Sequence, residues 1–141
     1  MQFRIAHFDD LTAREVYDML RLRAEVFVVE QECAYLDPDG DDLRATHLLA
    51  SEGGALCGYA RWYEEDGALR IGRVVTHPSR RGEGLGHDVM RACLAYVGDA
   101  EAFLHSQVYV QAFYAEHGFA PEGETFLEDD IPHVLMRRRG K

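Results

Sequence analysis

Cysteine patterns that would indicate a disulfide-rich or zinc-binding protein are missing from this chain. Its 141 residues include three cysteines, Cys33, Cys57 and Cys93, with no C-x-x-C pair and no histidine at metal-ligand spacing. Scattered thiols in odd number are typical of reduced cysteines, two of which we expect to pack in the core. The sequence therefore predicts neither a disulfide framework nor a metal site.

Long apolar runs are also absent. The first residues alternate polar and apolar side chains instead of forming a signal peptide, and no segment approaches the length of a membrane span. We therefore expect a cytoplasmic protein without a membrane partner. With 47% hydrophobic content, residues 1–141 have material for a single domain with one core and no room for a second.

Excess positive charge is missing as well. The formal net charge of −10 disfavours nucleic acid as a partner, because phosphate backbones attract basic faces, and it suits a cationic substrate better. The acidic residues gather at positions 37–42 and 128–130, where we expect solvated turns for most of them. A minority can face an amine, and the first loop can hold a second positive charge of an acceptor. The basic residues 137–141 are expected to form a frayed end.

What the chain does have is a glycine-rich turn between a strand and a helix. Residues 69–94 read LRIGRVVTHPSRRGEGLGHDVMRACL. Pro78 lacks the N–H group needed to continue the β-branched strand that precedes it, so the chain turns there. From Leu85 onward the apolar residues follow a helical spacing. The turn therefore leads directly into the N-terminus of an amphipathic helix.

This turn has the composition of an anion site. Gly82, Gly84 and Gly86 allow backbone N–H groups to approach an anion closely, and the helix that follows offers unpaired N–H groups and a positive dipole end. Arg80 and Arg81 add charge and bidentate donors. The pattern favours binding of a diphosphate; the alternative is a glycine-rich turn with two solvated arginines.

Spacing separates the known glycine motifs. A P-loop requires Lys and then Ser or Thr after its last glycine, but His87 follows Gly86, and the third glycine of a dinucleotide fingerprint would also fall on His87. The pattern R-x-x-G-x-G does fit, with Arg81, Gly84 and Gly86. This arrangement resembles the coenzyme A pyrophosphate loop of the GCN5-related N-acetyltransferases (GNAT).

Turn signals and periodicity divide the rest of the chain into alternating elements. Thr12 and Glu15 form a possible capping box for a helix, and the pairs Gly53-Gly54 and Asp66-Gly67 predict tight hairpins. Expected strands cover 2–8, 46–51, 56–63, 68–75 and 103–105 and lie around 125 and 134, with further helices from 85 and over 110–117. The result is a mixed α/β sheet with helices on its faces.

The order of these elements is similar to the GNAT fold from end to end. Three further segments, residues 22–31, 39–42 and 127–133, resemble the ElaA branch of that family. The resemblance implies a single-domain acyl-CoA N-acyltransferase fold with a mixed, mostly antiparallel sheet. It also implies acetyl-CoA as cosubstrate and transfer to a primary amine by direct attack in a ternary complex. The amine can belong to a small molecule or a protein.

The resemblance also assigns residues that bind the coenzyme. The strand end formed by Val74, Val75 and Thr76 is expected to separate from its neighbour, so that its main-chain groups bond the pantetheine arm and the thioester carbonyl. The diphosphate is then held by the glycine loop, which comprises Arg81, Gly82, Glu83, Gly84, Leu85 and Gly86.

Tyr114 is the candidate that assists the leaving thiolate. Residues 113–119 resemble the F-Y-x-x-x-G-F helix of the family, in which the tyrosine hydroxyl lies near the sulfur. A thiolate with a pKa of about 8.5 needs only modest help from a phenol with a pKa of about 10. The alternative is an aromatic side chain that packs beside Phe113 and Phe119.

Two residues are candidates for deprotonating the amine. Glu30 follows an apolar helix and can be a partly buried carboxylate with a raised pKa, or a helix-end carboxylate paired with Arg23 or another base. His133 can act through a water molecule, or it can be a strand-end histidine bonded to the backbone. His47, at the head of a strand, is expected to be structural.

Two other functions remain open at this stage. The chain can be a coenzyme A-binding sensor or partner module without turnover. Residues 22–31 also resemble acyl-homoserine-lactone synthases, which use S-adenosylmethionine and an acyl carrier. No cysteine has a partnered histidine, so a covalent enzyme intermediate is not expected. Strand edges near the C-terminus favour a possible homodimer.

Overall fold

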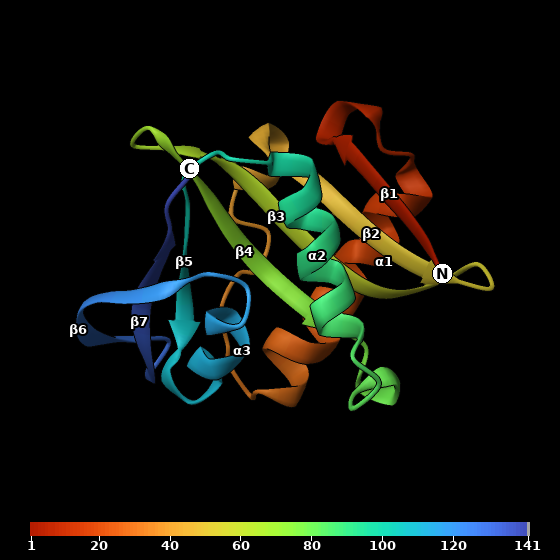
Figure 1. Ribbon diagram of the computed structural model, residues 1–141. Helices are drawn as coiled ribbons and strands as arrows, with labels where there is room; N and C mark the ends of the chain where they lie inside the picture. Colours follow the sequence, from red (N-terminus) through yellow and green to blue (C-terminus); the bar gives the residue numbers. More distant parts are fainter. Residues whose placement is uncertain (141) are drawn as a thin grey trace.

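A seven-stranded sheet in the order β1-β2-β3-β4-β5-β7-β6 forms the centre of the protein (Figure 1). The computed structural model describes residues 1–140. The strands are β1 (Gln2–His7), β2 (Thr46–Glu52), β3 (Ala55–Glu65), β4 (Ala68–Thr76), β5 (Ala102–Gln107), β6 (Ala120–Glu128) and β7 (Ile131–Arg138). The helices are α1 (Ala13–Arg23), α2 (Leu85–Val97) and α3 (Gln111–Ala115), with a π-helical segment η2 (Ala24–Glu30) and 3-10 turns η1 (Phe8–Asp10), η3 (Asp41–Arg44), η4 (Pro78–Arg80) and η5 (Val108–Val110).

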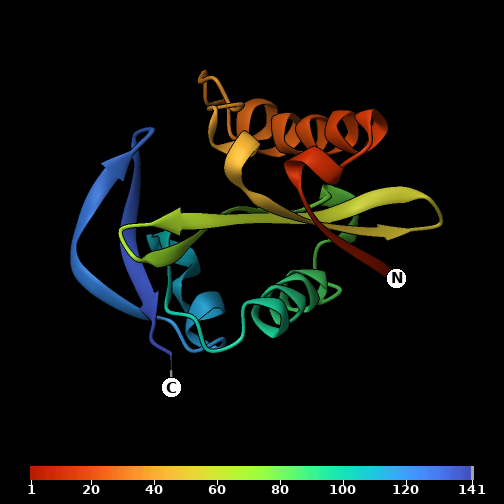
Figure 2. The ribbon, with the colours of Figure 1, turned by 90° about the horizontal axis from the view of Figure 1, so that it is seen from above.

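Helices cover both faces of the sheet, α1 on one side and α2 with α3 on the other (Figure 2). The larger core lies under α2 and includes Leu85, Val89 and Cys93, three residues of the predicted apolar helix face. The smaller core joins α1 to the sheet through Met19 and Leu22. Burial of such side chains contributes roughly 1.5–3 kcal/mol each, so both faces of the sheet are stabilised by apolar contact.

The predicted order of elements is confirmed, and so is the mixed, mostly antiparallel sheet. Neighbouring strands pair antiparallel except β4 and β5, which are parallel. Both predicted hairpin turns have positive φ at their two central residues: 60° and 81° at Gly53-Gly54, and 53° and 81° at Asp66-Gly67. Glycine and aspartate tolerate this backbone, which matches the twist of the strands that it joins.

Local signals at the N-terminus and the cysteines also agree with the sequence analysis. Thr12 and Glu15 form the predicted capping box of α1. Cys57 and Cys93 are buried and Cys33 is half-buried, and all three are free thiols. Within residues 1–140, no helix is both long enough and apolar enough to span a membrane.

The acidic loop before β2 (residues 37–42) differs from the solvated turn that we expected. Carboxylates of this loop bind arginine side chains inside the protein. Arg23 is fully buried at the end of α1, where its Nε donates to Asp37 at 2.8 Å and its Nη1 to Asp42 at 2.7 Å. Asp37 and Asp42 are only 4% and 6% exposed. The pKa of Asp42 is lowered, since hydrogen bonds and charge from Arg23 outweigh the opposing effect of burial.

Two further arginines complete this buried cluster. Arg61 on β3 donates to Asp42 at 2.8 Å and to Asp39 at 2.6 Å, and Arg73 on β4 donates to Asp37 at 2.8 Å. Three arginines therefore face three aspartates, and their charges balance. The expectation that this loop holds a second positive charge of the substrate is wrong, because protein arginines already occupy its carboxylates.

The basic end of the chain is also more ordered than expected. Arg137 and Arg138 belong to β7, where Arg137 donates to Glu122 at 3.0 Å and Arg138 to the carbonyl of Gly98 at 3.0 Å. Arg139 bonds Glu101 at 2.9 Å. The expected frayed end is wrong for these residues, whereas position 141 lies outside the described residues.

Removing the centre of the buried cluster is expected to destabilise the fold strongly. Arg23→Ala leaves two buried carboxylates without their main partner, which costs about 3–5 kcal/mol of unfolding free energy. Urea denaturation measures this loss. Arg21→Ala is the matched control on the same helix, since Arg21 forms an exposed pair with Glu25 worth about 1 kcal/mol or less. Equal losses in the two variants would contradict the analysis.

A pH dependence of stability is expected from the buried His47. Its Nδ1 accepts from Tyr59 at 2.5 Å and its Nε2 donates to the carbonyl of Asp42 at 2.9 Å, and burial lowers its pKa below 6.5. Below about pH 6.5 the unfolded chain binds a proton that the folded ring does not, so unfolding free energy decreases from pH 7 toward pH 5. Urea denaturation across this window tests the slope, which should be shallower in His47→Gln.

Candidate active site

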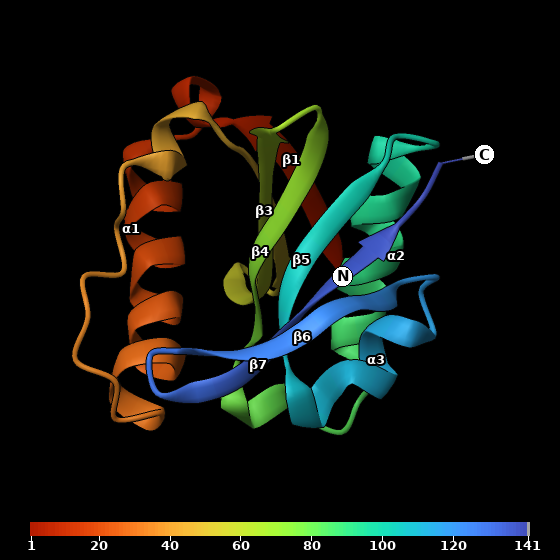
Figure 3. The same ribbon diagram turned by 90° about the vertical axis from the view of Figure 1, so that its left-hand side faces the viewer.

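A cleft opens where β4 and β5 separate. The two parallel strands pair only at Leu69 with Ala102 and at Arg70 with Phe103, and they diverge toward their C-terminal ends (Figure 1). Figure 3 shows the β6–β7 hairpin passing in front of the lower ends of β4 and β5. The gap holds a cavity of about 420 Å³, lined by residues of η2, β3 to β5, α3 and the β6–β7 hairpin. Seven of the predicted site residues line it together: Val74, Val75, Thr76, Arg81, Gly86, Tyr114 and His133.

An extra residue in β4 accompanies this separation. Arg61 of β3 pairs with Gly72 and Tyr59 pairs with Val75, so that two β4 residues face one residue of β3. Arg73 takes a φ of +52° in this bulge, an unusual backbone for a non-glycine residue. Its side chain reaches Asp37 of the buried cluster, which stabilises the bulged conformation. The following residues of β4 are thereby directed along the cleft.

The glycine loop has the backbone that an anion site requires. Gly82 and Gly84 have φ values of +81° and +80°, and Gly84 is the N-cap of α2 without a side-chain hydrogen bond. The first N–H groups of the helix therefore remain free for a ligand. A Cβ at Gly86 would lie 3.2 Å from Phe113, so this position leaves room only for glycine unless that ring moves.

The two arginines of the loop are paired with carboxylates. Arg80 donates to Glu83 at 2.8 Å, and Arg81 binds Glu30 through both Nη atoms, one of them at 2.7 Å. The pKa of Glu30 is lowered by the hydrogen bonds from Arg81. The expectation of a partly buried Glu30 with a raised pKa is wrong, because the side chain is exposed at the end of η2 and has a cationic partner. The predicted alternative, a paired helix-end carboxylate, describes it.

The remaining loop residues lie beside the cleft without lining it. Glu83 is engaged by Arg80, and the side chain of Leu85 is 3% exposed in the core under α2. Only the backbone of Leu85 can therefore contribute to binding. Among residues 1–140, no group of three or more histidine, cysteine or acidic side chains has the arrangement of a metal site.

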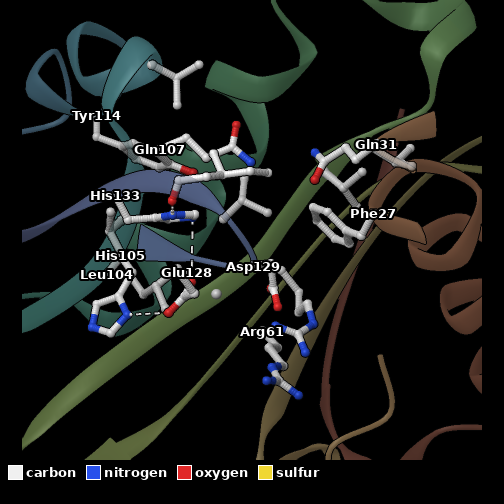
Figure 4. Close-up of a pocket in the computed structure, with 18 of the residues that line it drawn as sticks. Phe27, Gln31, Arg61, Leu104, His105, Gln107, Tyr114, Glu128, Asp129 and His133 are labelled. Atoms are coloured by element: carbon white, nitrogen blue, oxygen red, sulfur yellow. Dashed lines mark hydrogen bonds and ion pairs between the residues drawn. The ribbon is translucent and has the colours of Figure 1, made fainter. Parts of the chain in front are cut away.

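Tyr114 lies in the wall of the cleft. Its ring packs edge-on against Phe113 and Phe119, with centroid distances of 5.0 and 6.2 Å. Burial raises the pKa of Tyr114 to about 12, so the phenol keeps its proton at neutral pH. Figure 4 places Tyr114, Gln107 and His133 on the same side of the cavity. Tyr114 therefore combines the two predicted positions, because it packs against its aromatic neighbours and also lines the cavity.

A carboxylate between two histidines lies on the same side of the cavity as Tyr114, beyond His133 (Figure 4). Glu128 contacts Nδ1 of His105 at 3.0 Å through Oε1 and Nε2 of His133 at 3.5 Å through Oε2. The hydrogen bond with His105 lowers the pKa of Glu128. His133 is 7% exposed and its Nδ1 bonds the carbonyl of Ile131 at 2.7 Å, as in the predicted alternative, so its Nε2 faces Glu128.

Sequence reasoning missed Glu128 and His105 as members of the site. The register aligns Gln107 of β5 with His133 of β7, and His133 with Phe126 of β6. His105 and Glu128 lie two residues from Gln107 and Phe126, so their side chains point to the same face. The alternation within each strand was available from the sequence, but the pairing of the three strands was not.

Comparison with known proteins identifies the family. The pattern of the acetyltransferase (GNAT) domain matches residues 11–139. The UPF0039 protein Rv2851c of Mycobacterium tuberculosis is 44% identical, covering 93% of this chain and 88% of that protein. Protein ElaA of Escherichia coli is 37% identical over 98% of this chain and 96% of its own length.

A solved structure agrees with these relatives. An acyl-CoA N-acyltransferase from Pseudomonas aeruginosa superposes with a TM-score of 0.93 and 42% identity, covering 97% of this chain and 98% of that one. The similarity extends over the sheet, the glycine loop and the β6–β7 hairpin, because nearly the whole of both chains is aligned. This chain therefore has the GNAT acyl-CoA N-acyltransferase fold and belongs to the GNAT acetyltransferase family, in its ElaA-like group.

Proposed function

We propose that this protein transfers the acetyl group of acetyl-CoA to a primary amine by direct attack in a ternary complex. Its family membership supports acyl transfer. The observation that carries the proposal is the separation of β4 from β5, because it leaves the main-chain groups of residues 74–76 without strand partners on the β5 side. Those groups border the cavity that also contains Tyr114 and His133.

The residues around the cleft fit a coenzyme. A diphosphate suits the uncapped N-terminus of α2, where the positive φ of Gly84 and the missing Cβ of Gly86 leave the backbone accessible. Arg81 donates two hydrogen bonds to the diphosphate there, after its bond with Glu30 is broken. The extended arm then lies along Val74, Val75 and Thr76. The coenzyme supplies the activated acetyl group, and the protein supplies position and proton transfer.

Tyr114 assists departure of the thiolate. Its pKa of about 12 lies roughly three units above that of a thiol, so full proton transfer to sulfur is unfavourable and the phenol acts mainly as a hydrogen-bond donor. Such a donor stabilises the negative charge that develops on sulfur as the C–S bond breaks. This role needs a protonated tyrosine, which burial secures across the physiological pH range.

His133 accepts a proton from the amine, directly or through a water molecule. An ammonium acceptor loses two protons in the reaction: one leaves through His133 to solvent, and one is carried away by the thiolate. The nitrogen forms its bond to the acetyl carbonyl carbon, and the C–S bond breaks. Glu128 supports this role, because its carboxylate faces Nε2 of His133 at 3.5 Å. Glu30, engaged by Arg81 outside the cavity lining, has no part in it.

Calorimetric titration with acetyl-CoA tests the coenzyme assignment. We expect micromolar binding to the wild type and its loss in the double variant Arg81→Ala, Gly84→Ala, since this variant removes the anion donors and strains the N-cap. The matched control is Arg91→Ala, Gly98→Ala, which alters an arginine and a positive-φ glycine elsewhere along α2 and its C-cap. No binding to the wild type would overturn the proposal.

Thiol release with a panel of amines separates the remaining functions. Release with at least one amine supports the acetyltransferase, whereas binding without release across the panel supports a coenzyme A sensor. Release of methylthioadenosine from S-adenosylmethionine would instead support an acyl-homoserine-lactone-synthase-like activity.

Replacing the Tyr114 hydroxyl is expected to slow turnover without abolishing it. Tyr114→Phe keeps the ring packing and removes the donor, so kcat should fall about 10- to 100-fold, the effect of one hydrogen bond to a charged group, while the affinity for acetyl-CoA changes little. Steady-state thiol release measures both quantities. Tyr109→Phe is the control, because Tyr109 is 71% exposed in the preceding turn. An unchanged kcat in Tyr114→Phe would show that the ring only packs.

A further inference from the structure

Charges of opposite sign lie together in the lining of the cavity, where Arg70 and Glu128 contact the same nitrogen of His105. Glu128 and Asp129 come from the β6–β7 hairpin, and Arg61, Arg70 and Arg73 come from β3 and β4. Figure 4 labels Glu128, Asp129 and Arg61 around this space. All five side chains line the same space. A ligand held here meets an anionic wall and a cationic wall at once.

One hydrogen-bond donor of the cationic wall, Nε of Arg61, has no partner within the protein. Arg61 is only 3% exposed, yet its Nε is the one buried side-chain nitrogen or oxygen within residues 1–140 that has no hydrogen-bond partner. Buried donors without partners are rare in folded proteins and costly, so such a donor beside a cavity points to a ligand.

Arg70 is the least engaged member of this wall. It contacts Glu65 at 3.3 Å and Nδ1 of His105 at 3.3 Å, and 30% of its side chain is accessible. Arg73, by contrast, is bound to Asp37 and Asp39 of the buried cluster. Arg70 can therefore turn a guanidinium edge toward a ligand without breaking the structural cluster.

The anionic wall is reachable as well. The side chain of Glu128 is 41% exposed and bridges two histidines, so one carboxylate face remains open to the cavity. An ammonium at this carboxylate lies next to His133, the group that we propose to accept its proton. The two walls together thus define one position for an amine and another for an anion.

We propose that the acceptor is a small zwitterionic amine, whose ammonium binds Glu128 and whose carboxylate binds Arg70 beside Arg61. This assignment rests on the proposed acetyltransferase function and names the substrate class of the same site. A polyamine would place its additional positive charge beside Arg70, whose guanidinium lies outside the balanced cluster and repels it. A simple alkylamine would use the anionic wall alone and leave the guanidinium donors unpartnered.

Matched amines test the proposal through kcat/KM for thiol release from acetyl-CoA. Serine is compared with ethanolamine, which lacks only the carboxylate, and γ-aminobutyrate with butylamine and putrescine. We expect at least one amino acid to exceed its matched amine by about tenfold or more, the effect of one charge-assisted hydrogen-bonded contact. Putrescine, with its second positive charge, should be the poorest substrate of the four-carbon series.

Two variants, with a control, test which side chains recognise the acceptor. Arg70→Gln should reduce the ratio of kcat/KM for amino acid over matched amine by about tenfold, and Arg14→Gln, which alters an exposed arginine of α1 outside the cavity, should leave that ratio unchanged. Glu128→Gln should lower kcat/KM for every amine of the panel. Thermal unfolding of each variant shows whether the fold is intact.

The outcomes separate this proposal from the function on which it rests. Thiol release that favours alkylamines or putrescine, or a ratio unaffected by Arg70→Gln, overturns the zwitterionic acceptor and leaves the acetyltransferase in place. Acetyl-CoA binding without release for any member of the panel overturns the zwitterionic acceptor and favours the coenzyme A sensor over the acetyltransferase. A wild type that does not bind acetyl-CoA overturns both.

Discussion

The early separation of β4 from β5 is the constraint on which the rest of the molecule depends. A parallel pair that continued to the ends of both strands would close the sheet and leave no space beside Val74–Thr76. The bulge at Arg73 and the ion cluster behind it stabilise the open arrangement, because Arg73 binds Asp37 from its positive-φ backbone position. Stability and site are therefore coupled through the same residues, and the charge cluster that anchors α1 also shapes the cavity.

The two sides of the cavity differ in how they are built. On the glycine-loop side the chemistry is mainly backbone: free N–H groups, absent side chains and a helix end. On the side of the proposed acceptor it is mainly side chain, with Glu128, His133 and Arg70 placed by the sheet register. Backbone recognition tolerates changes of side chain, whereas side-chain recognition does not. This division explains how a common fold can keep one substrate and exchange the other.

The sequence predicted the parts whose causes are local. Hairpin turns, the capping box and the glycine loop depend on residues within a few positions, so their backbone follows from residue type. The prediction of a raised pKa for Glu30 was wrong because its partner, Arg81, lies 51 positions away in the sequence. The prediction of a solvated acidic loop was wrong for the same kind of reason, since Arg61 lies 19 positions from Asp42. The Glu128 cluster depends on three paired strands. Each missed feature is an electrostatic contact between elements, which composition and periodicity do not encode.

Under the proposed function, the pairing of Arg81 with Glu30 has a consequence for the catalytic cycle. In the structure this arginine is already bound by a carboxylate, so an incoming diphosphate exchanges one anion for another instead of filling an empty position. The gain from that contact is reduced by the ion pair that is lost. The same competition favours departure of the spent coenzyme, since Glu30 at the end of η2 can recapture the guanidinium. An internal competitor of this kind shortens the time for which the product stays bound. It raises turnover where release of the free thiol form is the rate-limiting step.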